Sequence, residues 1–359
     1  MKIITIIGAR PQFIKAAVVS RAIRLRSDAI TELIIHTGQH FDSNMSDIFF
    51  EELDIPKPHF HLGVGGGSHG QNTGRMLEKI EEVLLQEKPD FVLVYGDTDS
   101  TLAGTLAAVK LHIPVAHVEA GLRSFNRKMP EEINRILTDH ASEVLFTPTL
   151  TAVKNLNNEG IGASKIKQVG DVMYDAALYY GTKVEQNNTL LKNLEIESKK
   201  YALVTLHRAE NVDDKDRLTS IFKGLGEYSN QIILPLHPRT KKMIESFGIA
   251  IPFNIKIIDP IGYLDMILLE KHAAFIATDS GGVQKEAYFH KVPCITMRDQ
   301  TEWVELVEHG VNILTGADTN AIIEALTKVK NINPVLFEEP LYGNGTTGIA
   351  IVEALILNK

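Results

Sequence analysis

The chain has 359 residues, of which 44% are hydrophobic and 23% charged, and its formal net charge is −8. This length predicts two domains of ordinary globular composition, and the acidic balance disfavours duplex DNA, whose partners present basic faces. The single cysteine, Cys294, excludes an intrachain disulfide and a thiolate zinc site. No apolar run could span a bilayer, and the run before Gly8 is too short for a signal peptide, so we expect a cytoplasmic protein without a membrane partner.

Short apolar runs alternate with amphipathic stretches along almost the whole chain. The runs with the character of β-strands are residues 3–7, 32–37, 91–95, 115–119, 143–147, 201–207, 231–237, 255–259, 273–278 and 293–297. Helix-like stretches such as 71–88 lie between them, and several of the strands are apolar on both faces. This order predicts an α/β fold of doubly wound parallel sheets covered by helices on both sides.

The polar segment 182–200 interrupts this alternation, which restarts at Tyr201. We therefore expect an N-terminal Rossmann-like domain over residues 1–180 and a C-terminal one over 181–344, with a cleft between them. In open parallel sheets, ligands bind beyond the carboxyl ends of the strands. The residues that follow each strand are therefore the candidates for chemistry.

Two cations follow the first strand. Arg10 and Lys15 bring positive charge to a loop that begins at Gly8 and to a helix that Pro11 can start. They could bind an anionic ligand, or they could be the exposed cations of an ordinary strand–helix turn. Both interpretations stay open from the residues alone.

Carboxylates follow the two central strands of the first half. A helix after residues 91–95 needs only one capping residue, which leaves Asp97 as a candidate acid or base. Glu119 ends the next strand, where a buried carboxylate needs a partner. We interpret His117 on that strand as a packed, hydrogen-bonded core residue. The His-x-Glu pair is also found in zinc deaminases, but the Cys-x-x-Cys segment that they require is missing.

A helix opens at Pro130 with Glu131 and Glu132 in its first turn. Acidic residues suit the positive end of a helix dipole, and this alone could explain them. Arg127, Lys128 and Arg135 flank the two acids, however, and a helix start so rich in both charges indicates more than capping.

In the second half, two histidines each follow a strand directly. His207 precedes Arg208, and His237 is followed two residues later by Arg239. An imidazole can donate a hydrogen bond to phosphate or transfer a proton. The repetition of this pattern at two strand ends favours binding of a phosphorylated ligand.

The most specific local signal is the segment around Ser280. We expect Ser280 to cap a helix, while Gly281 and Gly282 let the backbone approach an anion and Glu286 accepts hydrogen bonds from ribose hydroxyls. A formal G-x-G-x-x-G match at 65–70 lies away from the first strand–helix turn. We interpret that match as a loop and not as a dinucleotide fingerprint, which disfavours a nicotinamide oxidoreductase.

Taken in order, these motifs resemble the non-hydrolysing UDP-N-acetylglucosamine 2-epimerase family over nearly the full length of the chain. The segments that carry the resemblance are residues 8–15, 37–40, 95–98, 117–124, 130–135, 207–211, 278–287 and 297–303. The resemblance implies a GT-B-like fold, a homodimer, and a C-terminal helix over 345–359 that completes the first domain. It also implies a reaction on a UDP-sugar with no metal and no redox cofactor.

The resemblance further implies roles for individual residues. Asp97, Glu119 and Glu131 would be the catalytic carboxylates, and His207 would act near the departing phosphate. The residues expected to bind UDP or the sugar are Arg10, Lys15, Arg123, Arg135, Arg208, His237, Ser280, Gly281, Gly282 and Glu286. The C2 proton of a UDP-sugar is not beside a carbonyl, so we expect elimination of UDP to a 2-acetamidoglycal and readdition, with Glu119 as base and the other carboxylates as acid or orienting groups.

The chain departs from the family pattern at several positions. Met129 stands where many members have Trp, and Trp303 stands in a segment that usually reads Thr-Glu-Arg-Pro-Glu. Both changes are similar to the branch acting on UDP-2,3-diacetamido-2,3-dideoxy-glucuronic acid, a precursor for surface polysaccharide. Arg127 and Lys128 would suit its C6 carboxylate, although a solvated charged turn is an equal alternative.

A second departure concerns regulation. Some bacterial members bind a second UDP-sugar as activator, and residues 39–40 match that region. Gly70 stands where these members often have Arg, so we do not expect activation. Two other functions stay open: a GT-B glycosyltransferase using a UDP-sugar donor, and a nucleotide-sugar sensor that leaves its ligand unchanged.

Overall fold

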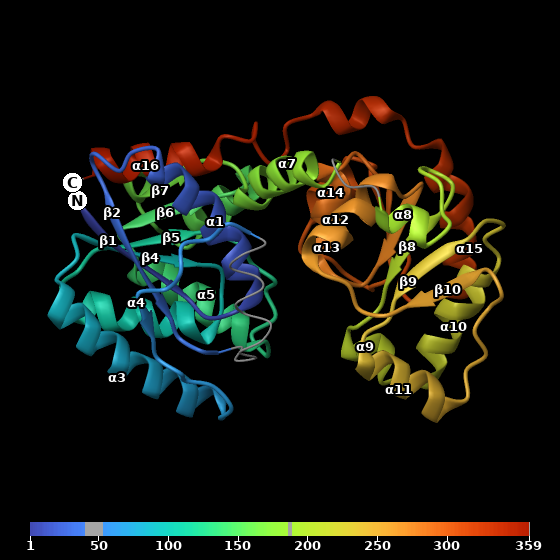
Figure 1. Ribbon diagram of the computed structural model, residues 1–359, viewed down its shortest axis with the longest axis horizontal. Coiled ribbons are helices and arrows are strands. Elements are labelled where there is room, and N and C mark those ends of the chain that lie inside the picture. The colour runs from blue at the N-terminus through green and yellow to red at the C-terminus, as the bar shows by residue number, and fades with distance from the viewer. Residues whose placement is uncertain (40–52, 186–188, 359) are drawn as a thin grey trace. The chain divides into compact units, whose positions relative to one another are not determined.

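The computed structural model describes residues 1–39, 53–185 and 189–358. These residues form two compact units, one comprising Met1–Ala176 with Tyr342–Lys359 and the other Ala177–Leu341. Each unit contains one sheet whose strands are all parallel (Figure 1). The predicted α/β class of two doubly wound parallel-sheet domains is therefore confirmed.

The first unit has a seven-stranded sheet in the order β3-β2-β1-β4-β5-β6-β7. Its strands are β1 (Lys2–Ile7), β2 (Thr31–His36), β3 (Phe60–His61), β4 (Phe91–Tyr95), β5 (Val115–Val118), β6 (Val144–Thr147) and β7 (Ile166–Gln168). Its helices are α1 (Arg10–Arg24), α3 (His69–Glu87), α4 (Asp99–Lys110), α5 (Pro130–Ala141), α6 (Leu150–Asn158), α7 (Val172–Val184), which runs on into the second unit, and α16 (Thr347–Leu357).

Helices cover both faces of this sheet, as its apolar strands require. Helices α3, α4 and α5 lie on one face, and α1 and α16 lie on the other (Figure 1). Helix α16 comes from the C-terminal end of the chain and packs on α1, where Gly348 approaches Val18. The Gly348 amide donates a hydrogen bond of 2.9 Å to Asp175 Oδ2, which ties α16 to the start of α7.

The second unit has a six-stranded sheet in the order β10-β9-β8-β11-β12-β13. Its strands are β8 (Ala202–Thr205), β9 (Ile232–Pro235), β10 (Ile255–Ile258), β11 (Phe275–Thr278), β12 (Cys294–Thr296) and β13 (Asn312–Leu314). Its helices are α8 (Thr189–Asn193), α9 (Ala209–Val212), α10 (Lys215–Gly226), α11 (Pro238–Phe247), α12 (Tyr263–His272), α13 (Gly281–Phe289), α14 (Val304–Glu308) and α15 (Thr319–Lys328).

Both sheets reverse their strand order at one point. In the first unit the reversal lies between β1 and β4, and in the second it lies between β8 and β11. At such a switch point the loops after neighbouring strands diverge to opposite faces and leave a crevice that binds ligands in doubly wound folds. The candidate residues after β1, β4, β8 and β11 therefore stand at these two points. None of the helices in the described part of the chain combines the length and apolarity needed to cross a membrane.

Candidate functional site

In the first unit, Gln12 fixes the loop after β1 against the end of β4. Its Oε1 accepts hydrogen bonds from the amides of Gly8 (2.8 Å) and Ala9 (3.0 Å), and its Nε2 donates to the Tyr95 carbonyl at 2.9 Å. A Cβ atom on Gly8 would overlap Thr37 Oγ1, so only glycine fits there. The entry to α1 is therefore held at a set position beside β4.

Lys15 of α1 forms an ion pair with Glu119, which follows β5 directly. The two side chains are only 10% and 11% exposed, respectively, so the pair is largely shielded from water. Glu119 has φ +72°, in the left-handed region, and its amide donates to the Phe146 carbonyl at 3.1 Å. A non-glycine residue there carries strain of about 1–3 kcal/mol, which is typical of functional positions.

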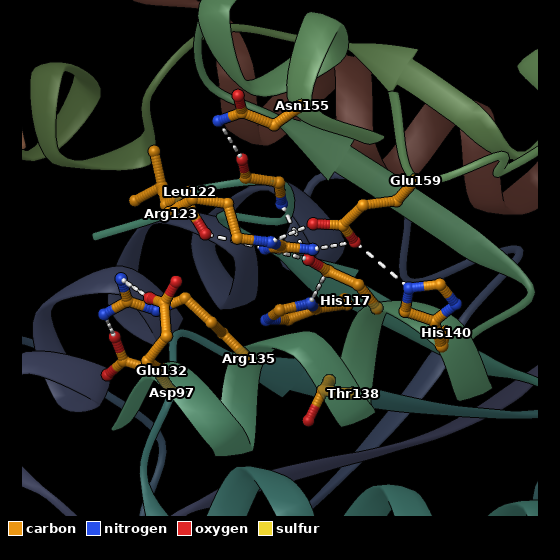
Figure 2. Close-up of polar contacts among 12 residues, drawn as sticks. Asp97, His117, Leu122, Arg123, Glu132, Arg135, Thr138, His140, Asn155 and Glu159 are labelled. Atoms are coloured by element: carbon orange, nitrogen blue, oxygen red, sulfur yellow. Dashed lines mark hydrogen bonds and ion pairs between the residues drawn. The ribbon is translucent and has the colours of Figure 1, made fainter. Parts of the chain in front are cut away.

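Arg135 of α5 lies between two carboxylates, those of Asp97 and Glu132 (Figure 2). Burial lowers the pKa of Arg135, but the charges of Asp97, Glu132 and Glu119 outweigh burial and raise it overall. Asp97 and Glu119 follow the neighbouring strands β4 and β5, and Asp97 pairs with Arg135 whereas Glu119 pairs with Lys15. Glu131, in the first turn of the same helix, is exposed and forms no hydrogen bond or ion pair with any of the described residues.

Arg123 and His117 belong to a separate buried network (Figure 2). His117 is fully buried, with Nδ1 2.7 Å from Asp139 Oδ1 and Nε2 2.7 Å from the Gly96 carbonyl oxygen, which confirms its interpretation as a core residue. The Arg123 side chain is 1% exposed and donates to Asp139 at 2.7 Å and to Glu159 at 2.6 and 2.7 Å.

This arrangement corrects one expectation from the sequence. Arg123 was expected to contact the substrate, but its side chain is 1% exposed and its guanidinium is paired with Asp139 and Glu159, so in this structure it supports the fold. Burial alone would raise the pKa of Asp139, but contact with His117 and Arg123 lowers it below its ordinary value. The network fixes the turn after β5 that presents Glu119.

In the second unit, Asp279 at the end of β11 joins the two loops of the switch point. Its buried carboxylate accepts from the amides of His207 (3.1 Å) and Arg208 (3.0 Å) and lies 3.2 Å from His207 Nδ1. The His207 side chain is 47% exposed, and its Nε2 remains the ring nitrogen that can meet a ligand. Asp279 was not predicted as a site residue, although its place directly before Ser280 was a usable signal.

Ser280 occupies the N-cap position of α13, but its hydroxyl makes no capping hydrogen bond, so the expectation of a side-chain cap is wrong. Its amide instead donates to Thr278 Oγ1 at 2.9 Å. Gly282 is exposed, and a Cβ atom on it would come no closer than 3.9 Å to a neighbour. The N-terminus of α13 therefore offers amide groups and a helix dipole to an anion.

The remaining candidates of the second unit differ in what they do. His237 caps α11, because its Nδ1 accepts from the Arg239 amide at 3.2 Å, which leaves the proton of the neutral ring on Nε2. Glu286 is 9% exposed and lies one turn into α13. Arg208 is partly buried and forms the N-cap position of α9.

Two expectations fall outside what the structure describes. Arg10 opens α1, but its side chain is not among the described parts, and His40 is not among the described residues. Within the described ranges, no three His, Cys, Asp or Glu side chains are grouped so as to hold a metal ion.

Comparison with known proteins gives one consistent family. Residues 23–356 match the family described as UDP-N-acetylglucosamine 2-epimerase. The chain is 55% identical over 360 residues to UDP-2,3-diacetamido-2,3-dideoxy-D-glucuronate 2-epimerase of Pseudomonas aeruginosa, with 99% of each chain covered. It is also 55% identical over 360 residues, again with 99% of each chain covered, to a UDP-N-acetylglucosamine 2-epimerase homolog of Methanococcus maripaludis.

Among solved structures, the chain is similar to the UDP-GlcNAc 2-epimerase of Methanocaldococcus jannaschii in complex with UDP-GlcNAc and UDP. The TM-score is 0.88 at 49% identity, and the match covers 99% of this chain and 100% of the other. The resemblance inferred from the motifs is confirmed, together with the GT-B-like class of the fold. The chain belongs to the UDP-N-acetylglucosamine 2-epimerase family and is an enzyme of the UDP-sugar 2-epimerase type.

Proposed function

We propose that this enzyme inverts C2 of a UDP-2-acetamido sugar by eliminating UDP and adding it back. The observation that carries the proposal is the pair of carboxylates at neighbouring strand ends of the first unit, with Asp97 paired to Arg135 and Glu119 paired to Lys15. The groups after β8 and β11 in the second unit supply what a departing diphosphate needs.

In the first step a carboxylate removes the C2 proton while the C1–O bond breaks and its electron pair leaves with UDP. A C1=C2 double bond forms, and the sugar becomes a 2-acetamidoglycal. In the second step a proton is added to C2 from the opposite face, and the UDP oxygen bonds to C1 again. Atoms and electrons balance without an oxidant or reductant.

We assign the base role to Glu119, with Asp97 and Glu131 as acid or orienting groups. Glu119 is 11% exposed, whereas Asp97 is 32% exposed and Glu131 lies open to solvent. A base shielded from water keeps water away from the reactive intermediate. Such a positioned base contributes about 10²–10⁴-fold to the rate.

The leaving group would be bound by the second unit. The free N-terminus of α13 at Gly281 and Gly282 suits a phosphate, and Glu286 would accept from the ribose hydroxyls. His207 Nε2 would donate to the phosphate oxygen that takes up charge, with Asp279 orienting the ring. Further groups proposed to contact UDP are Arg10, Lys15, Arg135, Arg208, His237 and Ser280.

The two candidate substrates differ in the sugar substituents at C3 and C6. The relatives at 55% identity carry the names of a diacetamido-glucuronate epimerase and of a UDP-N-acetylglucosamine epimerase homolog. The loop before α5 holds two exposed cations, Arg127 and Lys128, which suit a C6 carboxylate. We propose the UDP-2,3-diacetamido-glucuronate as the preferred substrate, with UDP-N-acetylglucosamine as the alternative.

The test is incubation of the enzyme with each UDP-sugar alone, with the configuration at C2 followed by NMR. Epimerisation without an acceptor supports the proposal, whereas a glycosyltransferase would wait for an acceptor and a sensor would leave the sugar unchanged.

We further propose that the enzyme is a cytoplasmic homodimer that supplies surface-polysaccharide precursors. Light scattering of the purified protein tests the dimer.

A further inference from the structure

We propose that Glu132 is a positioning residue, which sets Asp97 through Arg135 and couples this carboxylate to the loop 124–129. The inference rests on the proposed function, since it assigns Asp97 to the reaction. Glu132 is the second of two adjacent glutamates in the first turn of α5. Glu131 is exposed, whereas Glu132 is 1% exposed.

The carboxylate of Glu132 receives four hydrogen bonds. Oε1 accepts from the Phe125 amide at 2.9 Å, and Oε2 accepts from the amide and the hydroxyl of Ser124, both at 2.9 Å. Arg135 donates the fourth to Oε2 at 3.0 Å. A buried carboxylate must be paired in this way, and here the donors come from both sides of the group.

Ordinary helix capping does not explain these contacts. A glutamate at the third helical position usually reaches back to the amide of the N-cap residue, here Met129. The Met129 amide instead donates to the Asn126 carbonyl at 3.0 Å, and Glu132 reaches past it to Ser124 and Phe125. The side chain therefore holds the loop and not the helix end.

The loop that Glu132 holds has an unfavourable backbone. Phe125 has φ +58°, in the left-handed region that bulky residues avoid, and it is 77% exposed, so packing of its ring does not impose the conformation. The hydrogen bond from the Phe125 amide to Glu132 imposes this conformation. The same loop carries the exposed cations Arg127 and Lys128.

Arg135 transmits the position of Glu132 to Asp97. One terminal nitrogen of its guanidinium binds Glu132 and the other binds Asp97 (Figure 2), so the planar group cannot turn without breaking one of the two contacts. Asn134 donates to the Asp97 carbonyl at 3.0 Å and fixes the backbone of the same residue. The orientation of the Asp97 carboxylate thus depends on a continuous set of contacts that begins at Ser124.

The main test is Glu132→Gln. Both carboxylate oxygens of Glu132 accept hydrogen bonds from N–H donors. A glutamine replaces one of these oxygens with an NH₂ group, which cannot accept, so the donor facing it would lose its partner. We expect kcat to fall about 10²-fold, as for a misplaced catalytic group, with KM changed less than about threefold. Glu87→Gln is the matched control, because it weakens a carboxylate–lysine contact in the same unit, at the start of β1, that does not reach Asp97 or Glu119. We expect it to lower stability and leave kcat unchanged.

A double-mutant cycle separates positioning from general destabilisation. If Glu132 acts through Asp97, Glu132→Gln has almost no further effect on kcat in an Asp97→Asn background, whereas independent effects multiply. Arg135→Lys keeps the charge but cannot hold both carboxylates at once, so it should reproduce the loss and serves if Glu132→Gln does not fold.

The outcomes of these experiments distinguish failure of the positioning role from failure of the proposed function. Full kcat in folded Glu132→Gln or in Arg135→Lys, or multiplying effects in the cycle, overturns the positioning role while the wild-type reaction stands. Absence of turnover by the wild-type enzyme on both UDP-sugars would instead remove the proposed function itself.

Discussion

Nδ1 of His207 lies 3.2 Å from Oδ1 of Asp279, although the two residues are 72 positions apart in the chain. They come from the loops after β8 and β11, which meet at the switch point of the second sheet. Asp279 also accepts from the amides of His207 and Arg208, so it fixes both the ring and its backbone. This relationship gives the His207 ring one defined orientation, which its proposed contact with the departing phosphate would need.

Asp279→Asn should therefore lower kcat about 10²-fold, because the amide cannot accept from all of these donors and the imidazole loses its orientation. His207→Gln should cause a comparable loss, and the double variant should lose no more than either one alone. Steady-state kinetics of the three variants measures this. Multiplying losses would show that the two residues act independently.

The three carboxylates proposed as catalytic should be separable from UDP binding. Asp97→Asn, Glu119→Gln and Glu131→Gln should each lower kcat by about 10²–10⁴-fold, while the affinity for UDP changes little. Calorimetric titration with UDP and turnover measurements test this together. Full turnover in all three variants would remove the assignment of these residues.

Two adjacent glycines provide a matched pair for the anion site. A Cβ atom on Gly281 would overlap Glu302 Oε1, the end of a flexible side chain that pairs with Arg298, so Gly281→Ala should displace Glu302 and lower the melting temperature. Gly282 has open space around its Cβ direction, so Gly282→Ala should leave the melting temperature nearly unchanged. It should nevertheless weaken UDP binding about tenfold or more, because the methyl group would stand where phosphate approaches. Unchanged UDP affinity in Gly282→Ala would argue against this site.

Substrate choice should depend on the loop before α5. Replacing Arg127 and Lys128 together with alanine should lower kcat/KM for the diacetamido uronate about 10–100-fold, the loss expected for about 1.4–2.7 kcal/mol of ion pairing. The same change should leave kcat/KM for UDP-N-acetylglucosamine within a factor of about two. Equal effects on both sugars would place these cations outside sugar recognition.

The buried carboxyl of Glu270 should make stability depend on pH. Burial, and then the charge of Glu286, raise the pKa of Glu270 well above its ordinary value of 4.5, and neither oxygen has a hydrogen-bond partner among the described residues. A raised pKa in the folded state contributes stability below pH 4.5 that is lost as the pH rises through the folded value. Glu270→Gln should therefore raise the free energy of unfolding at pH 7 relative to the wild type.

The difference should close as the pH falls below 4.5, because the wild-type carboxyl is then neutral in both states. Urea unfolding at a series of pH values measures it. Parallel pH profiles for the two proteins would show that Glu270 does not titrate with a raised pKa in the folded state.

The sequence predicted most of the fold. All ten strand-like runs form strands, because each has an apolar run that the sequence makes recognisable. Strands β3, β7 and β13 were not predicted. Each is a two- or three-residue strand at the edge of its sheet, with only one fully buried residue among the three of them, so none has an apolar run to recognise.

The candidate site was predictable where a functional residue directly follows a strand. It was less predictable where the role of a residue depends on partners far away in the chain. Arg123 was expected to bind the substrate because its partners Asp139 and Glu159 are 16 and 36 residues away in the chain and the sequence does not show that they pair with it. Glu131 and Glu132 look alike in the sequence, and only the fold shows that one is exposed and the other holds a loop. Residue type marks a candidate, whereas burial and pairing decide its role.

The central claim is that the C2–H bond breaks while UDP is detached. Turnover of either UDP-sugar in D₂O, followed by ¹H NMR, tests it most directly. The account predicts an epimerised product that carries deuterium at C2, with the H2 signal absent and the H1 signal simplified. A product that retains full protium at C2 after epimerisation would contradict it.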